Sequence, residues 1–381
     1  MNNKTIIPFE IIRIDPLGQG VSLLDDKVTF ISKAIPGDKG IAEVIETKGP
    51  KVQFAKIQEL TTQSEERTES PCPHFNECQG CAYLNMNYKK EGSYKKEAYS
   101  FLFKEIFSPE EIEYIEAPQR LNYRNRIQLS YDLVDGSIGF KTREGILEIP
   151  NCMIAKEPIQ KELQKFYQND KYWHNLLPKD APKEGHIELY LLNGELKTTV
   201  NQPYSSGGFS QVHQEMADLA RNQISQSLEK ESPTTGTIEL FGGSGFLTEG
   251  YQGPRVICDQ DLGNEDSYKV AFIDMNLFGK FGPEKVNKVL GNQQSVYSTD
   301  HWQMIIDPPR SGLKNFAKFL NQPNLSKDLK QIAYLSCNPQ TQVRDLKNLL
   351  ESKKWRIQKI TFFDFFPATH HLESLVILER L

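Results

Sequence analysis

The carboxyl-terminal half of this sequence alternates short apolar runs with stretches of helical spacing. Parallel strands need a connection about as long as a helix, so this alternation predicts a parallel sheet with helices on both faces. A helix is expected from Gln214 to Glu229, ahead of the first apolar run. The predicted strands are 237–241, 255–258, 304–306, 331–335 and 375–378. The fold class expected here is α/β, a doubly wound and parallel-rich sheet.

The rest of the chain predicts two further domains, because 381 residues are enough for several cores. From Ile6 to about Leu60, short β-rich runs broken by glycine predict a small β-barrel. The polar, acidic segment 61–70 is typical of a linker. A predicted helix at 88–107 and a hairpin about Asp135-Gly136 then indicate a central α+β unit. We therefore expect domains at 1–60, 61–205 and 206–381.

The charge balance argues against a uniformly basic nucleic-acid protein, since the net charge is −5 and the isoelectric point is about 5.9. No apolar run approaches the roughly 20 residues of a membrane span, and residues 1–8 lack a signal-peptide pattern, so we expect a cytoplasmic protein without membrane contact. A local basic cluster remains a candidate RNA surface, with a solvated helix face as the alternative. Its members are Lys89, Lys90, Lys95, Lys96, Arg120, Arg124, Arg126, Lys141 and Arg143.

A glycine-rich turn, 239–245, follows the first predicted strand of the sheet. Gly243 and Gly245 would let a ligand approach the backbone, and an acidic residue ending the next strand, Asp259 or Asp261, would hold a ribose. The lysine of a phosphate-binding loop is absent, which favours S-adenosylmethionine as the cofactor. The alternative is a plain tight turn between a strand and a helix.

Cys337 is the candidate nucleophile, because it directly follows the apolar run 331–335. A buried, inert cysteine is the alternative. Two carboxylates have to be considered with it. Asp307 precedes Pro308-Pro309 and has a turn or helix cap as its alternative, and Glu373 has a surface carboxylate as its alternative.

Four of the six cysteines have the spacing of a metal site. Cys72, Cys78 and Cys81 form C-x5-C-x2-C, and Cys152 lies beyond the predicted hairpin. In a reducing compartment such a set indicates metal binding or catalysis before disulfides. Four thiolates hold either zinc or an iron–sulfur cluster, and spacing does not choose between them. Cys258, on a predicted strand, is expected in the core.

Taken together, the motifs resemble a known family over nearly the whole chain. The chain is similar to the S-adenosylmethionine-dependent 5-methyluridine RNA methyltransferases, in the branch with an N-terminal TRAM barrel and an iron–sulfur cluster. The motifs that carry the resemblance are Gly18-Gln19-Gly20, Cys72-Pro73-His74-Phe75, Cys78-Gln79-Gly80-Cys81, Tyr123-Arg124-Asn125-Arg126, Phe209-Ser210-Gln211-Val212, Asp307-Pro308-Pro309-Arg310, Ser336-Cys337-Asn338-Pro339 and His371-Leu372-Glu373-Ser374.

The resemblance implies a fold and a set of roles. It implies a TRAM-like or OB-like barrel, a central cluster-bearing domain and a Rossmann-like class I methyltransferase domain. Cys337 would be the nucleophile and Glu373 the base that removes a proton. The residues implied to contact the cofactor are Gln211, Phe241, Asp259 and Asp307, and those implied to hold a four-iron, four-sulfur cluster are Cys72, Cys78, Cys81 and Cys152. That cluster would be structural or would position RNA.

The function implied is methylation of carbon 5 of a uridine in RNA, with 23S ribosomal RNA as the expected substrate and uridine 54 of transfer RNA as the alternative. The sequence departs from the family at 241–246, where Phe-Gly-Gly-Ser-Gly-Phe replaces the usual Phe-Cys-Gly-x-Gly-Asn. A non-catalytic RNA-binding or folding protein with a degenerate cofactor site is therefore a second alternative. Methylation of cytosine or of DNA is a third alternative, although those cytosine enzymes that carry a Pro-Cys pair differ from the Ser336-Cys337 order here. No obligate protein partner is expected.

Overall fold

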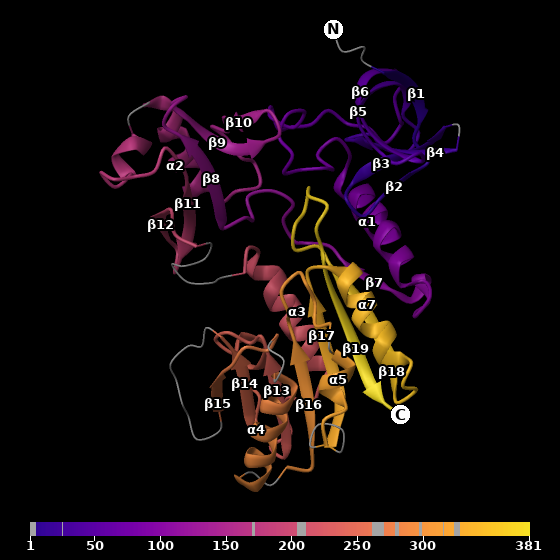
Figure 1. Cartoon of the computed structure of the whole chain (residues 1–381), viewed down its shortest axis with the longest axis vertical. Helices are drawn as coiled ribbons and strands as arrows, with labels where there is room; N and C mark the ends of the chain where they lie inside the picture. The colour runs from indigo at the N-terminus through magenta and orange to yellow at the C-terminus, as the bar shows by residue number, and fades with distance from the viewer. Residues whose placement is uncertain are drawn as a thin grey trace. The chain divides into compact units, whose positions relative to one another are not determined.

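A computed structural model of the chain describes residues 5–24, 26–169, 172–203, 211–260, 270–278, 282–296, 299–314, 316–323 and 328–381. Its contacts divide the chain into two compact units, each assembled from three segments. The first unit comprises Met1–Ala98, Ala117–Glu215 and Phe365–His371, and the second comprises Tyr99–Glu116, Met216–Asp364 and Leu372–Leu381. Figure 1 colours the chain by residue number, so the late yellow segment of the first unit can be followed there.

The first unit begins with a six-stranded, largely antiparallel sheet in the order β1-β5-β6-β4-β3-β2. Its edge strands, β1 and β2, are separated along the chain by two residues only. The second of these residues, Ile12, donates its amide hydrogen to the carbonyl of Val21 in β3 at 3.0 Å. The strands are β1 (Ile6–Glu10), β2 (Arg13–Ile14), β3 (Gln19–Leu24), β4 (Lys27–Ser32), β5 (Lys39–Lys48) and β6 (Val52–Thr62).

A second sheet of this unit has the order β10-β9-β8-β11-β12. The predicted hairpin is confirmed, since β8 and β9 pair antiparallel on either side of a turn in which Gly136 has a φ of 66°. Helix α2 packs on this sheet and contributes the buried side chains Ile159, Leu163 and Phe166 to a core cluster. The elements are β8 (Arg126–Asp132), β9 (Ser137–Thr142), β10 (Gly145–Leu147), α2 (Glu157–Gln168), a short 3₁₀ helix (Trp173–Leu176), β11 (Glu184–Leu192) and β12 (Glu195–Val200).

The basic cluster predicted between Lys89 and Arg143 is not one open cationic face. Lys95, on α1 (Tyr88–Phe103), is fully buried and pairs with Glu91, and Arg126 is 1% exposed and pairs with Glu188. Burying a charge is unfavourable unless it is paired, so these cations serve the interior of the unit. Three further members also have acidic partners: Lys90 with Glu66, Arg120 with Glu91 and Arg143 with Glu46.

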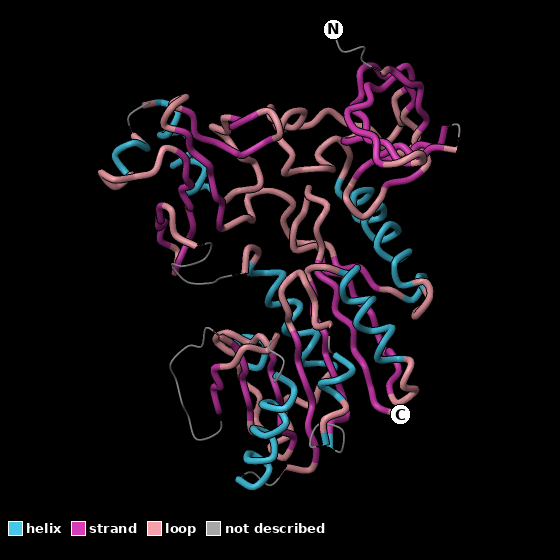
Figure 2. Tube along the Cα trace, in the orientation of Figure 1, coloured by secondary structure: helices cyan, strands magenta, loops and turns pink. Residues whose placement is uncertain are grey.

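The second unit is built on one eight-stranded sheet in the order β15-β14-β13-β16-β17-β19-β18-β7. Strands β15 to β17 are parallel, whereas β19 runs antiparallel between β17 and β18. Figure 2 shows helices alternating with these strands. The elements are a 3₁₀ turn (Pro109–Glu111), β7 (Glu113–Ile115), α3 (Gln214–Ser227), β13 (Thr235–Leu240), a 3₁₀ turn (Phe246–Thr248), β14 (Arg255–Asp259), β15 (Val270–Asp274), α4 (Gly282–Val296), β16 (His301–Ile306), α5 (Phe316–Leu320), β17 (Leu329–Ser336), α7 (Pro339–Leu350), β18 (Trp355–Phe363) and β19 (Glu373–Arg380).

The five strands predicted for this half are confirmed, as is the helix that precedes them. They are recognisable because their side chains are buried on both faces, which gives continuous apolar runs. The two edge strands, β15 and β7, and the strand β18 next to β7 were not predicted. Strand β7 comes from 113–115, far from its partner β18 in sequence. Among the described residues, no helix is long and apolar enough to cross a membrane.

Candidate active site

The predicted site residues of the second unit gather at one edge of its sheet. Phe241 follows β13, Asp259 ends β14, Asp307 follows β16 and Cys337 follows β17. These are carboxyl ends of parallel strands, so the four side chains share one edge, next to the point where the order of strands reverses between β13 and β16. Ligands of open α/β sheets bind in this position.

The glycine turn after β13 is held in an uncommon backbone conformation. Phe241, Gly243 and Gly245 have φ values of 61°, 51° and 79°. A Cβ added at Gly245 would lie 2.3 Å from the Cδ1 atom of Ile257, whereas a Cβ at Gly243 would meet nothing within 4 Å. Gly245 is therefore needed for packing, and Gly243 leaves the backbone open to a ligand.

Asp259 is hydrogen-bonded to the backbone of the glycine turn. Its Oδ2 accepts a hydrogen bond from the Gly243 amide at 2.9 Å, and its Oδ1 accepts one from the Gln260 amide at 2.6 Å. The alternative ribose ligand, Asp261, lies outside the described residues. Burial, with the nearby carboxylate of Asp259, raises the pKa of Asp307 to about 7. Two acids therefore stand close together where a cofactor would bind.

Glu239, on β13 beneath this turn, is a further buried acid. Its Oε2 accepts a hydrogen bond from the Thr248 hydroxyl at 2.5 Å. Burial raises the pKa of Glu239 to about 7. A Cβ at Gly242 would lie 2.8 Å from the Cγ of Glu239, so this carboxyl packs directly under the glycine turn.

Cys337 lies in the turn from β17 to α7. Pro339 occupies the first turn of the helix, where proline fits because its missing N–H would have had no helical partner. The Asn338 amide donates to the Ser336 hydroxyl at 3.1 Å and closes the turn. The helix then anchors back on the sheet, because Gln342 Nε2 donates to the Tyr334 carbonyl at 2.8 Å.

The register of β17 and β19 brings Cys337 and Glu373 together. These strands pair antiparallel with Ser336 opposite Ser374. Cys337 directly follows Ser336 at the end of β17, and Glu373, the first residue of β19, directly precedes Ser374. The carboxylate of Glu373 lies near enough to contribute to the raised pKa of the Cys337 thiol. The pairing of the two strands thus brings together residues that are 36 positions apart in the sequence.

The surroundings of this pair disfavour the charged form of both groups. Burial raises the pKa of the Cys337 thiol to about 12, and the nearby carboxylates of Glu373 and Asp307 contribute to that rise. Burial also raises the pKa of Glu373 well above its usual value, with Asp307 again contributing. Within the described part of the chain, the buried Oε2 atom of Glu373 receives no hydrogen bond.

Arg310 is the functional candidate that the sequence analysis did not single out. Its charge lowers the pKa values of both Cys337 and Glu373, against the larger effect of burial. Its carbonyl also accepts hydrogen bonds from Asn338 Nδ2 at 3.0 Å and from the Thr341 hydroxyl at 3.2 Å. The sequence did contain a signal for Arg310, because it is the only basic residue of the motif Asp307-Pro308-Pro309-Arg310.

The unusual Phe246 is accommodated by packing. The guanidinium of Arg221, on α3, lies 4.5 Å from the centre of the Phe246 ring. Arg221 also pairs with Asp218 and Glu249. The departure from the family motif therefore has a structural role here, as a partner for an arginine.

Gln211 belongs to the first unit. Its carbonyl accepts a hydrogen bond from Asn125 Nδ2 at 2.8 Å, which ties it to the start of β8. The following residues are also held there, since the Asn125 amide donates to the Val212 carbonyl at 3.2 Å and the His213 ring stacks on Tyr123 at 4.9 Å between ring centroids. The two motif residues before Gln211 lie outside the described residues.

The four cysteines of the first unit line one small apolar pocket, which also contains Phe75 and Ile154. Burial raises the pKa of the Cys81 thiol, and the other three thiols lie close enough to raise it further. Yet among the described residues, no three histidine, cysteine or acidic side chains come together closely enough to hold a single metal ion. Cys258, by contrast, is fully buried in the core of the second unit, as predicted.

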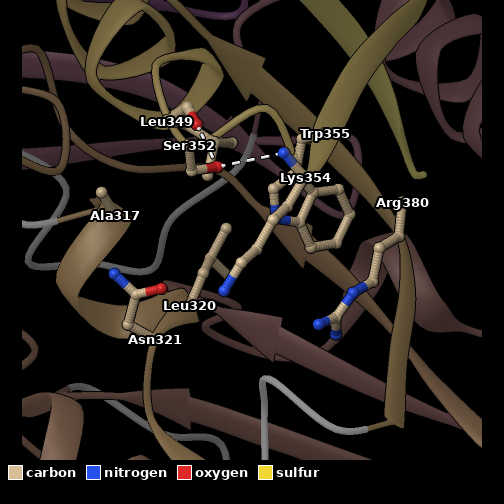
Figure 3. Close-up of a pocket in the computed structure, with 8 residues that line it drawn as sticks. All are labelled: Ala317, Leu320, Asn321, Leu349, Ser352, Lys354, Trp355 and Arg380. Atoms are coloured by element: carbon tan, nitrogen blue, oxygen red, sulfur yellow. Dashed lines mark hydrogen bonds between the residues drawn. The ribbon is translucent and has the colours of Figure 1, made fainter.

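Another small pocket lies at the opposite end of β19, lined by Asn321, Lys354, Trp355 and Arg380 among others (Figure 3). Arg380 is the last residue of β19 and Glu373 the first, so roughly 23 Å of strand separates them at about 3.3 Å per residue. This pocket is therefore not part of the arrangement around Cys337.

Comparisons with known proteins point to one family. Residues 287–381 match the family model described as tRNA (Uracil-5-)-methyltransferase. Over its length the chain is similar to the 23S rRNA (uracil(1939)-C(5))-methyltransferase RlmD of Francisella tularensis subsp. novicida, with 24% identity over 99% of this chain and 97% of that protein. It is also similar to the tRNA (uracil(54)-C(5))-methyltransferase of Schizosaccharomyces pombe, with 25% identity over 98% of this chain and 78% of that protein.

A solved structure has the same fold. It is that of the tRNA (uracil-54, C5)-methyltransferase of Pyrococcus abyssi in complex with S-adenosyl-L-homocysteine. The TM-score is 0.62 at 18% identity, and the match covers 97% of this chain and 99% of that one.

Proposed function

We propose that this chain, a member of the RNA uracil-5-methyltransferase family, transfers a methyl group from S-adenosylmethionine to carbon 5 of a uridine in RNA. The observation that carries the proposal is the proximity of Cys337 and Glu373, at neighbouring ends of the paired strands β17 and β19. A nucleophile and a base held at a fixed spacing are the two protein groups that this reaction requires.

The chemistry assigns each group a step. Carbon 5 of uracil is a poor nucleophile, so the Cys337 thiolate first adds to carbon 6 and generates an enolate. Carbon 5 then attacks the methyl group of the sulfonium. The bond from that methyl group to sulfur breaks, and the neutral thioether S-adenosylhomocysteine is the leaving group. Carbon 5 now carries both the methyl group and its original proton. Glu373 removes that proton, the double bond re-forms, and the Cys337 thiolate is expelled from carbon 6.

Protonation has to change before these steps. Cys337 reacts as a thiolate, and its pKa of about 12 leaves it protonated in the free protein. Glu373 must be ionised to act as a base, and its pKa is also raised. We assign to Arg310 the task of favouring the charged forms, because it lowers the pKa of both groups.

The residues proposed to hold the methyl donor are those at the carboxyl edge of the sheet. Asp259 would accept hydrogen bonds from the ribose hydroxyls, and the open face of Gly243 would let the donor approach the backbone. Phe241 and Gly245 shape the turn, Asp307 is near Asp259, and Gln211 is a further residue proposed to contact the donor. The donor carries no phosphate, which agrees with a site without a basic cradle.

The substrate proposed is 23S ribosomal RNA, because several full-length relatives carry that name. Transfer RNA is the second candidate, since a relative similar over 98% of this chain is named for uridine 54 of transfer RNA. In either case the uridine has to leave its stack, because carbon 5 and carbon 6 both need to be approached by protein groups.

The test uses the purified full chain with methyl-labelled S-adenosylmethionine. Ribosomal RNA and transfer RNA from cells that lack the gene are offered separately, and the labelled nucleoside is identified after digestion. We expect 5-methyluridine at one site of 23S ribosomal RNA and none with Cys337→Ala. Label at uridine 54 of transfer RNA would support the second candidate. Absence of label from both RNAs, with no binding of the methyl donor, would support a non-catalytic RNA-binding protein instead.

For the first unit we propose a TRAM-like barrel at 1–60 and a cluster-bearing domain at 61–205, with the methyltransferase domain at 206–381. The four cysteines that line one pocket, Cys72, Cys78, Cys81 and Cys152, would hold a four-iron, four-sulfur cluster, with zinc as the alternative. The protein purified without oxygen should be brown and contain iron and sulfide. Colourless protein with one zinc per chain would contradict the cluster.

A further inference from the structure

The loop Phe365–His371 links β18 to β19 and is held by the first unit, although both strands belong to the second. Glu373, the first residue of β19, follows this loop after a single intervening residue. The path of the loop therefore determines where the chain that carries Glu373 enters its strand.

The backbone of this loop is bound at three consecutive residues. Lys95 Nζ donates to the Phe366 carbonyl at 3.1 Å, and the Tyr123 hydroxyl donates to the Pro367 carbonyl at 3.0 Å. The Ala368 amide donates to Glu91 Oε1 at 2.6 Å. Ala368 is fully buried with a φ of 67°. For an L-residue this conformation costs roughly 1–2 kcal/mol, so the surrounding bonds are required to hold it.

A buried ion network provides two of these bonds. The side chains of Glu91 and Lys95 are both fully buried, and their Oε1 and Nζ atoms are 2.9 Å apart. Arg120 pairs with the other carboxylate oxygen of Glu91, also at 2.9 Å. Buried ion pairs add little net stability compared with apolar residues, and they are best explained where they fix one conformation among several.

The same network also contacts the two residues that follow Cys81. Arg120 Nη2 donates to the Tyr83 carbonyl at 2.7 Å, and the amides of Ala82 and Tyr83 donate to the Ala368 carbonyl at 2.8 and 3.1 Å. Gly18, from the amino-terminal sheet, completes the packing. A Cβ at Gly18 would lie 2.7 Å from the Cβ of Ala82 and 3.2 Å from that of His370.

We propose that the Glu91–Lys95–Arg120 network positions the catalytic base, by fixing the loop Phe365–His371 from which Glu373 emerges. These three are positioning residues, since they hold the loop backbone and act on the reaction through Glu373. The inference rests on the proposed function, because it assigns a role relative to the Glu373 step.

The chemistry gives a readout specific to this role. If Glu373 is displaced while Cys337 is not, thiolate addition and methyl transfer proceed but removal of the carbon-5 proton slows. The protein then accumulates as a covalent adduct with methylated RNA that survives denaturing electrophoresis. A merely structural residue would lower activity without accumulating this adduct.

Lys95→Met tests the proposal, because it keeps the length of the side chain and removes the bond to Phe366. Lys104→Met, at an exposed position directly after the same helix and outside the basic cluster, is the matched control. For Lys95→Met we expect turnover to fall about 10- to 100-fold, the effect of a misplacement near 1 Å, with KM for the methyl donor unchanged. Labelled adduct should accumulate in the first turnover, while Lys104→Met behaves as wild type.

Tyr123→Phe gives an independent measurement if Lys95→Met does not fold, since it removes the bond to Pro367 and keeps the ring. Wild-type turnover in folded Lys95→Met or Tyr123→Phe would overturn the proposal, and so would reduced turnover without adduct. Failure of the proposed function can be distinguished from failure of the positioning proposal. If the proposed function is wrong, the wild-type protein will neither methylate RNA nor form an adduct with RNA that contains 5-fluorouridine.

Discussion

Cys337 is expected to be nearly inert in the free protein and to gain reactivity steeply as the pH rises. Its pKa is raised to about 12 by burial and by the carboxylates of Glu373 and Asp307, whereas a free cysteine has a pKa of about 8.5. At pH 8 the thiolate fraction would be about 10⁻⁴, against about a quarter for a free cysteine. The stronger nucleophilicity of a more basic thiolate recovers about 40-fold, so reaction with a disulfide reagent should be about 60-fold slower.

The assay is pH-dependent labelling without RNA or methyl donor. An aromatic disulfide reagent is added between pH 7 and pH 10, and modification of the peptide containing Cys337 is followed by mass spectrometry. The rate should rise about tenfold per pH unit without reaching a plateau by pH 10. Limited access of the reagent to the thiol lowers the labelling rate by the same factor at every pH. It does not change the pH at which the rate reaches its plateau, so that pH reports the pKa of the thiol alone.

Two variants complete this experiment. Glu373→Gln removes one of the carboxylates that raise the pKa, so its profile should move to lower pH. Ser93→Cys, at an exposed position on α1, provides the reference thiol with a plateau above about pH 8.5. A wild-type plateau near that of Ser93→Cys would refute the reasoning, because Cys337 would then have the pKa of a solvated thiol.

Three further outcomes are expected. Glu373→Gln should still transfer methyl but accumulate the covalent adduct with RNA on denaturing gels; rapid turnover without adduct would exclude Glu373 as the base. The pKa of Glu239 is raised to about 7 in the folded state, whereas a glutamate in the unfolded chain has a pKa of about 4.3. Between these two pKa values the folded state keeps a proton that the unfolded state has lost, so the free energy of unfolding falls as the pH rises. Amide exchange in β13 should show that wild type loses about 2–3 kcal/mol more than Glu239→Gln from pH 5 to pH 8, whereas parallel curves would contradict the raised pKa. Gly243→Ala should weaken binding of the methyl donor in equilibrium dialysis with a small change in melting temperature, and Gly245→Ala should lower the melting temperature because Ile257 must move; equal effects of the two on both measurements would argue against the separate roles.

The doubly wound sheet was predictable because its central strands are buried on both faces and are continuous in apolar residues. Strand β7 was not, since Glu113–Ile115 is short and reads as a loop until its partner β18 is known. The amino-terminal sheet was recognisable from β-rich runs broken by glycine, but its strand order, with β1 and β2 at opposite edges, has no signal in the sequence.

The candidate site was predictable as a set of residue types and only partly as a geometry. Cys337, Asp307 and Asp259 follow from the rule that functional residues end parallel strands. The proximity of Cys337 and Glu373 depends on the antiparallel pairing of β19 with β17, and the register of such a pair cannot be deduced from apolar runs that are buried on both faces. The basic cluster failed as a predictor because sequence spacing does not reveal buried partners such as Glu91 and Glu188.

The interleaving of the two units bears on how such a protein can be divided or recombined. The chain crosses between them repeatedly, and the segment Phe365–His371 returns to the first unit just before the last strand of the second. No single cut releases an intact second unit, and a fragment beginning at 216 would carry its loop without the side chains that hold it. Exchange of the first unit between relatives therefore has to include both α1 and this loop.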